Sequence, residues 1–488
     1  MSEKFRHGVY VTEAATPRPA VVLGTSTVQV VVGTAPVNVV EDVAAAVNKP
    51  ILVTSAADAE TKLGYSSDFN KYTLCQSMWL TNNLYPAYPV VYINVLDPAK
   101  HKTALAETTA TVTDLEAVVK VEGIIRDNLV VKFGEETLTI NDDYTLSYDA
   151  DGNLVVTLTS DGAAASATSI KVSGFKLDPS AVTAADIIGV YDTTAGTITG
   201  IQAVNLIFPM YGVIPGVLLA PGWSQISAVG QALIARCDAI NGVFRCEALL
   251  DLDTATVRKA SDVEAAKAAA GYTSPRCYVL WPCDKVGDVI FAKSAVIGAK
   301  IQYDITSNDD VPSISPSNKV SDGITGQCLK DGTEIYLDID SANEINSYGV
   351  ATTINFDGYR LWGNYTGAYP ESDDPKDIWF NVRRMFSWQA NSFIRLYFGR
   401  VDDLMNSRMV ESLVDSENIR CAALAPTHWA GASIQYDPED NPHEQLMQGK
   451  VVFKQKLAPY LPMQVIYNEL SYDIDMLRDA LGGGGEEE

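Results

Sequence analysis

The chain has 488 residues, of which 47% are hydrophobic, so its length and composition indicate about two to four folded domains with real cores. Its formal net charge is −25. A surface with this charge repels phosphate backbones and anionic lipids, which excludes nucleic acid and membrane surfaces as expected partners. The same repulsion keeps free subunits soluble and makes any self-assembly sensitive to salt.

Neither a secretion signal nor a membrane span is predicted. The first 20 residues are polar and lack the apolar segment of a signal peptide. Residues 206–223 are uncharged, but three prolines and three glycines interrupt them. Because prolines at that spacing break a helix repeatedly, we predict buried strands and turns in this stretch.

The amino-terminal part is predicted as an arm followed by a first core segment. Residues 8–12 are strand-like, and prolines at positions 17 and 19 keep the chain out of helix, so residues 1–20 form the arm. Residues 21–97 form the core segment. The elements expected there are strands within 21–35 and at 90–95, and helices at 58–63 and 70–80.

Composition changes at Pro98, where Thr, Val, Asp, Gly and Ala become abundant. Strand-like residues 144–148 and 154–158 flank Asp149-Ala-Asp-Gly-Asn153, which predicts a β-hairpin. The loop resembles a calcium-binding loop only superficially, because its glycine comes too early and no closing glutamate follows. We predict an inserted, β-rich surface domain over residues 98–195.

Residues 196–358 alternate between strands and helices, which predicts a parallel α/β sheet. Strands are expected at 217–220, 248–252 and 277–281. The first intervening helix is expected to be capped by Ser224. The second spans 262–270 and ends at Gly271. This segment is the second part of the core.

A carboxy-terminal α+β domain is predicted over residues 359–461. A capping box at 341–344 precedes it. Within it we expect a long aromatic helix from Asp374 to Tyr397, a second helix at 405–423 and a strand at 450–456. A further strand at 464–468 falls in residues 462–488, which are predicted as a carboxy-terminal arm ending in a flexible acidic tail.

The search for catalytic chemistry finds almost nothing. There is no P-loop, nucleophile elbow or dinucleotide-binding glycine motif, and the chain has only four histidines. Two carboxylate pairs, Asp251 with Asp253 and Asp338 with Asp340, are spaced to share a face at predicted strand ends. Capping and turn roles are the simpler explanation. No catalytic residue, cofactor or metal site is predicted.

The seven cysteines have no CxxC spacing, so a zinc or thioredoxin-type site is not predicted. We expect reduced, mostly buried thiols in a protein made in a cytoplasm. An open alternative is that exposed cysteines cross-link neighbouring subunits once a particle leaves the cell.

The aromatic residues between 362 and 397 are interpreted first as core packing and second as a subunit interface, since aromatic and arginine side chains anchor interfaces. A ligand-stacking surface is a further, less common reading. The candidate interface residues are Trp362, Trp379, Arg383 and Arg384.

Several segments resemble the tail sheath proteins of contractile-tailed bacteriophages and related contractile injection particles. They are RLWGNYTGAYP at 360–370, IWFNVRRMF at 378–386, LMQGKVVF at 446–453 and LAPYLPMQ at 457–464, with FRHGVYVTE at 5–13 and LLAPGW at 218–223 in support. The insertion carries no such segment.

This resemblance implies a fold with an α/β core sheet, an inserted β-rich surface domain, a carboxy-terminal α+β domain facing an inner tube, and extended arms at both ends. It implies a structural subunit that stacks as hexameric rings around the tube and contracts from a metastable extended state. Baseplate and tail terminator proteins are the further partners. The expected location is the virion tail, after assembly in the host bacterial cytoplasm.

The resemblance also implies that the arms add strands to the sheets of neighbouring subunits. The arm strands in this sequence are Val9, Tyr10, Val11, Val465, Ile466 and Tyr467. Two alternatives remain open at this point. One is a lattice or surface protein whose insertion binds a ligand or cell surface, and the other is a hydrolase that uses an aspartate pair or a cysteine.

Overall fold

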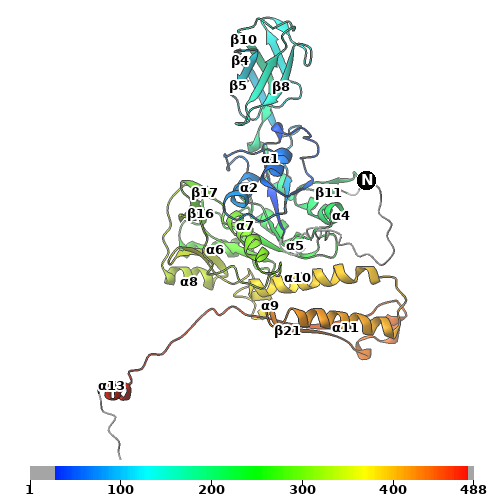
Figure 1. Ribbon diagram of the computed structural model, residues 1–488, viewed down its shortest axis with the longest axis vertical. Helices are drawn as coiled ribbons and strands as arrows, with labels where there is room; N and C mark the ends of the chain where they lie inside the picture. Colours follow the sequence, from blue (N-terminus) through cyan, green and yellow to red (C-terminus); the bar gives the residue numbers. More distant parts are fainter. Residues whose placement is uncertain (1–27, 193, 482–488) are drawn as a thin grey trace, which may run out of the picture.

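The computed structural model describes residues 28–192 and 194–481, and an eight-stranded sheet lies at its centre (Figure 1). The strand order is β2-β3-β1-β13-β14-β15-β19-β20, with β2 and β20 as antiparallel edges of an otherwise parallel sheet. The strands are β1 (Gln29–Gly33), β2 (Pro50–Val53), β3 (Val90–Asn94), β13 (Val217–Leu219), β14 (Glu247–Asp251), β15 (Cys277–Leu280), β19 (Val350–Asn355) and β20 (Tyr359–Trp362). The inner parallel strands are short apolar runs because both faces of the sheet are covered.

Helices α2, α5 and α7 pack against the inner strands, and α8 packs against β19. The helices of this core are α1 (Ala56–Leu63), α2 (Leu74–Asn83), α3 (Ala184–Ile188), α4 (Ile207–Tyr211), α5 (Ser227–Asp238), α6 (Val263–Ala270), α7 (Lys293–Thr306) and α8 (Ile339–Ser347). Two small sheets accompany them, β11 (Tyr191–Asp192) with β12 (Thr197–Ile198), and β16 (Cys283–Val286) between β17 (Val289–Phe291) and β18 (Gly326–Cys328). None of the described helices is long and apolar enough to cross a membrane.

The β-rich insertion projects from the core at the end of the molecule opposite to the carboxy-terminal helices (Figure 1). One of its sheets contains β4 (Lys102–Thr111), β10 (Ser169–Leu177), β6 (Val130–Phe133) and β7 (Glu136–Thr137), and the other contains β5 (Glu116–Val119), β9 (Leu154–Leu158) and β8 (Tyr144–Tyr148). Its two sheets bury a hydrophobic cluster of their own, whereas Ile125 and Leu177 pack with the core. The expected hairpin between β8 and β9 is present. The Asp149 carboxylate holds the turn by accepting from the backbone N–H groups of Asp151 and Asn153.

Excising the insertion is expected to leave the rest of the chain folded. Lys102 and Leu177 are paired across β4 and β10, so a short glycine linker can replace residues 103–176. The excision removes the contacts of residues 122–126 with the core, which are the hydrogen bonds of Glu122, Ile124 and Arg126 and the packing of buried Ile125. The shortened chain should elute as a soluble species and retain the cooperative urea transition of the core. Aggregation or loss of that transition would mean that the core depends on the insertion.

The carboxy-terminal domain lies below the core sheet in Figure 1, where two long helices run side by side above a β-ribbon. Its elements are α9 (Pro375–Ile378), α10 (Phe380–Tyr397), α11 (Ser407–Ala423), β21 (Trp429–Tyr436), α12 (His443–Leu446) and β22 (Phe453–Pro459). A small cluster of Val311, Met385, Cys421 and Trp429 is buried between them. The last element, α13 (Ile474–Ala480), lies at the end of an extended segment that leaves the domain.

Two helix caps differ from the sequence-based expectation. Helix α5 begins at Ser227, because the Ser224 hydroxyl, expected as its cap, instead donates 3.1 Å to the buried carboxylate of Asp251. The expected capping box at 341–344 is also wrong. Asp338 caps α8 by accepting 2.8 Å from the backbone N–H of Ser341, which begins the helix earlier.

Two further expectations concern longer stretches. The helix predicted from Asp374 to Tyr397 is broken at Trp379, which is extended (φ −91°, ψ 119°). Its neighbours pair with another segment, because Thr366 N–H donates to Ile378 and Phe380 N–H donates to Asn364. Residues 206–223 contain the strand β13, but helix α4 occupies part of the region where only strands and turns were predicted.

Candidate assembly interface

The carboxy-terminal arm leaves the body of the molecule as an exposed, extended segment (Figure 1). Residues 460–473 contain no helix or strand, so the strand predicted at 464–468 is not formed within the described single chain. The predicted arm residues Val465, Ile466 and Tyr467 are 61%, 76% and 93% exposed, and other large apolar side chains beside them are also exposed. A run of apolar side chains in water indicates a surface that another molecule covers.

The β-ribbon of β21 and β22 offers a place where such a segment can bind. The two strands pair antiparallel over seven registered positions, and no third strand among the described residues pairs with either. Alternate residues of β22 are exposed along its whole length. The outer edge of β21 packs against α11, where the side chain of Asn418 accepts from the backbone N–H of Ile434 and donates to its carbonyl. Strand β22 has no neighbouring strand on its outer edge among the described residues, so its unpaired N–H and C=O groups can accept an added strand.

A buried carboxylate holds the ribbon against the two long helices. Glu417 of α11 accepts 2.6 Å from Gln389 of α10, 2.9 Å from Gln455 of β22 and 2.7 Å from Arg420. Burial would raise the pKa of Glu417, but the hydrogen bonds from Arg420 and Gln455 outweigh it and lower that pKa. The carboxylate therefore stays ionised and fixes the ribbon to a rigid support.

The carboxy-terminal arm starts at the end of β22, which the long helices hold in place. The carbonyl of Tyr460 accepts 3.1 Å from the amide of Asn381 in α10, immediately after β22 ends. Beyond that bond the chain extends away from its own domain, as Figure 1 shows. The anchored start directs the arm outward, where a neighbouring molecule can meet it.

The candidate residues Arg383 and Arg384 lie inside the subunit, between α10 and the core sheet. Arg383 pairs with Asp377 at 3.1 Å, and both guanidinium groups are buried. Burial lowers the pKa of Arg384 to about 10, although the Glu247 carboxylate opposes the shift. They join the carboxy-terminal domain to the core within one subunit, and their role between subunits remains a prediction.

The two candidate tryptophans are half-buried. The Trp362 indole donates 3.0 Å to Asn343 of α8, and the Trp379 ring lies 4.9 Å from that of Tyr365. Each ring thus has a partner in its own subunit and some exposed surface. The amino-terminal arm residues Val9, Tyr10 and Val11 lie outside the described residues.

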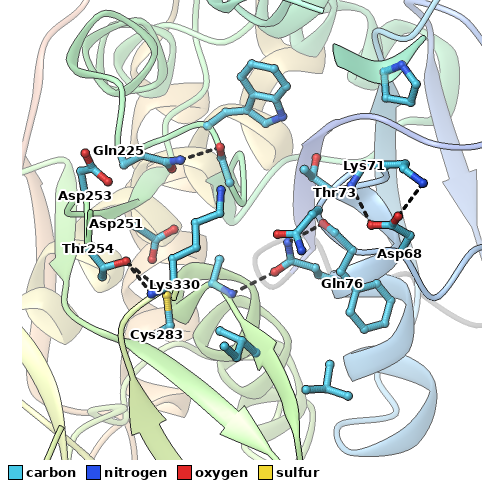
Figure 2. Close-up of a pocket in the computed structure, with 18 of the residues that line it drawn as sticks. Asp68, Lys71, Thr73, Gln76, Gln225, Asp251, Asp253, Thr254, Cys283 and Lys330 are labelled. Atoms are coloured by element: carbon cyan, nitrogen blue, oxygen red, sulfur yellow. Dashed lines mark hydrogen bonds and ion pairs between the residues drawn. The ribbon is translucent and has the colours of Figure 1, made fainter. Parts of the chain in front are cut away.

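A cavity of about 700 Å³ opens at the carboxyl ends of β13, β14 and β15 (Figure 2). Asp251 lines it, but its carboxylate accepts bonds from Ser224 and Ser294. Burial raises the pKa of Asp251, whereas Asp253 accepts from the backbone of its own turn. Burial also raises the pKa of Cys283, another lining residue, to about 12, so this thiol is a poor nucleophile at neutral pH.

This cavity therefore gives little support to hydrolysis. No histidine lines it, and its buried aspartate is already bonded. The second pair does not form a site either, because Asp338 caps α8 and Asp340 lies exposed in the first turn of that helix. Within the described residues, no group of three or more metal-ligating side chains gathers.

Sequence reasoning missed the residue that organises the joint between the domains, Glu247. It lies 1% exposed at the start of β14, beside Arg276 of the core and Ser387 of α10. Its carboxylate also faces Arg383 and Arg384 across the joint. A charged residue directly before the apolar run 248–250 was the available signal.

No protein-family model matches the chain. The tail sheath protein of Burkholderia phage BcepMu is 26% identical over 495 aligned positions, covering 99% of this chain and 100% of that protein. The predicted resemblance to tail sheath proteins is confirmed by this match.

Two solved structures share the fold. A chain in the cryo-EM structure of the anti-feeding prophage baseplate aligns with a TM-score of 0.57 and 15% identity, covering 96% of this chain and 99% of that one. A chain of the anti-feeding prophage helical sheath in its contracted state aligns with a TM-score of 0.56 and 14% identity over the same shares. The predicted fold class is confirmed.

Proposed function

Because this chain is a relative of the tail sheath proteins, we propose that it is a structural subunit of a contractile sheath. The observation that carries this role is the match over the whole length of a tail sheath protein, together with the fold of a contracted sheath. The chain is thus a component of a phage tail or a related particle. The comparisons lend no support to the alternative, a lattice or surface protein whose insertion binds a ligand.

Assembly proceeds by strand addition. The exposed segment around Ile466 adds to a free edge of the β21–β22 ribbon in a neighbouring subunit, and the amino-terminal arm adds to another edge. Support comes from the exposed apolar side chains of the arm and from the unpaired outer edge of β22 in the described ribbon. The contact is head-to-tail, so it propagates into a helical array instead of closing on itself.

The subunits stack as hexameric rings around an inner tube, with a baseplate at one end and a terminator at the other. The extended array is kinetically trapped during assembly. On triggering, the subunit bodies move as rigid units into a more extensively packed arrangement while the arms act as hinges. The energy is stored in the array, so the role is mechanical rather than catalytic.

The domains divide the work along the chain. The arms, residues 1–20 and 462–488, connect subunits. The core segments 21–97 and 196–358 form the rigid body, and residues 359–461 face the tube. The insertion, residues 98–195, lies on the outside, consistent with its place at the far end from α10 and α11 (Figure 1).

Negative-stain electron microscopy of the purified chain across a range of salt concentrations tests this role. Salt screens the repulsion between subunits of formal charge −25, so hollow, striated tubes should appear as salt and protein concentration rise. Addition of the cognate tube protein should lower the concentration needed. Dispersed monomers or small closed oligomers, with the tube present and at high salt, would contradict the sheath role.

A further inference from the structure

Two buried thiols lie in contact at the joint between the core sheet and the carboxy-terminal domain. Cys237 is in the last turn of α5, and Cys246 directly precedes β14. Their sulfur atoms are 3.3 Å apart, and the two residues are 0% and 1% exposed. Among the described residues no other two thiols lie within hydrogen-bonding distance, although all seven cysteines are free.

The backbone holds this pair in position. The N–H of Cys246 donates 3.0 Å to the carbonyl of Cys237, and the segment between them reverses through mutual bonds between Ile240 and Phe244. Ile240 and Phe244 are both buried, so the two ends of the reversal are packed as well as bonded. A disulfide needs its two backbone positions close together, and this arrangement supplies that proximity.

The segment between the thiols also contacts the carboxy-terminal domain. Asn391 of α10 accepts 2.9 Å from the N–H of Arg245 and donates 2.7 Å to its carbonyl. At the other end, Asp238 accepts 2.7 Å from Arg276. A covalent link between Cys237 and Cys246 would therefore close a loop that contacts helix α10 on one side of the joint and Arg276 of the core on the other.

We propose that Cys237 and Cys246 form an intramolecular disulfide when the chain meets hydrogen peroxide, and that this bond stiffens the joint. Peroxide oxidises one thiol to a sulfenic acid and releases water, and the second thiol then displaces a second water to form the S–S bond. The two thiols lose two electrons, and the peroxide oxygen atoms leave in water. That the change follows particle release rests on the proposed sheath role, whereas the chemistry does not.

Burial controls the rate of this reaction. It raises the pKa of Cys237, so little of the reactive thiolate is present at neutral pH. Attack requires opening of the reversal, whose tip at Asn241 to Val243 is exposed. The pair therefore remains reduced in a cytoplasm and oxidises gradually outside it.

Trypsin makes the bond directly measurable, because cleavage after Arg236, Arg245 and Arg258 places the two cysteines in separate peptides, 237–245 and 246–258. The full-length chain is treated with peroxide, its free thiols are alkylated in denaturant, and the digest is analysed by mass spectrometry without reductant. We expect the two peptides joined, two hydrogen atoms lighter than their sum, and separated by reductant. Oxidation of Met447 and Met463, which are 81% and 80% exposed, verifies the peroxide dose.

Recovery of both peptides singly, alkylated or as sulfinic acids, at a dose that oxidises those methionines would overturn the proposal. The stiffening is tested separately by thermal unfolding. Oxidation should raise the midpoint of the wild-type chain reversibly and leave that of Cys246→Ala unchanged. An equal change in both chains would contradict the role at the joint. Neither measurement requires the chain to assemble. Both can therefore be interpreted even if the proposed sheath role is wrong.

Discussion

Replacing Ile466 with proline is expected to abolish tube formation while the single chain remains folded. Proline removes the backbone N–H that an added strand donates to its partner, and it fixes the backbone outside the sheet ladder. In the single chain Ile466 is 76% exposed and outside any helix or strand, so the change in unfolding free energy should stay within about 0.5 kcal/mol. Electron microscopy measures the tubes and urea unfolding measures the fold.

Ile466→Val is the matched control, because it retains the N–H and has high strand propensity. It should form tubes like the wild-type chain. If Ile466→Pro also forms them, the segment around Ile466 does not pair as a strand, and the side chains of the arm rather than its backbone make the contact. Truncation after Leu461 removes both the backbone and the side chains of the arm, so continued tube formation by that chain would show that assembly does not need the arm.

Replacing Glu247 with glutamine is expected to destabilise the chain by about 3–5 kcal/mol, the usual result of leaving a buried ion pair with one partner. The substitution preserves shape but removes the carboxylate that faces the guanidinium of Arg276 at 3.3 Å. It also removes the negative charge that offsets buried Arg383 and Arg384. Because these arginines join α10 to the core, the carboxy-terminal domain should lose protection first. The shift in the urea midpoint measures the loss.

Asp238→Asn is the control for this change. Asp238 also pairs with Arg276, at 2.7 Å, but its side chain is 73% exposed. Because water solvates the Asp238 carboxylate, its loss should cost about 1 kcal/mol, less than the loss of buried Glu247. Equal midpoint shifts for the two substitutions would show that Glu247 is not the dominant counter-charge at the joint.

The sequence predicted the parallel sheet well because its strands carry their own signal. Apolar runs such as 248–250, separated by helices with clear stops such as Gly271, have few alternative folds. The hairpin around Asp149 was predicted for the same reason, because its turn and strand signals lie next to each other in the sequence. The errors occurred where a distant residue competes for a backbone or hydroxyl group. Asp251 binds Ser224 and removes it from the helix cap, and residues 364–366 pair with the chain around Trp379 and break the helix.

The assembly surface was predictable only in part. The arm segment at 465–467 is identified by strand-forming residues outside the α/β core, and the structure adds its exposure and the free outer edge of β22. The joint around Glu247 was not predictable, because its partners come from a core loop and a distant helix that no periodicity connects. The arginines were found in the sequence, but their burial inside the subunit depends on tertiary packing.

The insertion enters and leaves the core through β4 and β10, which run side by side as one paired ladder. The structural effect of a mutation inside the insertion can thus be transmitted to the core sheet and the carboxy-terminal helices through little more than that ladder and residues 122–126. Sequence changes confined to this projecting part should therefore leave the packing of the core and the carboxy-terminal domain unchanged. Related chains should therefore differ most in sequence between Lys102 and Leu177. Replacement of this segment by an unrelated domain should leave the proposed contraction intact.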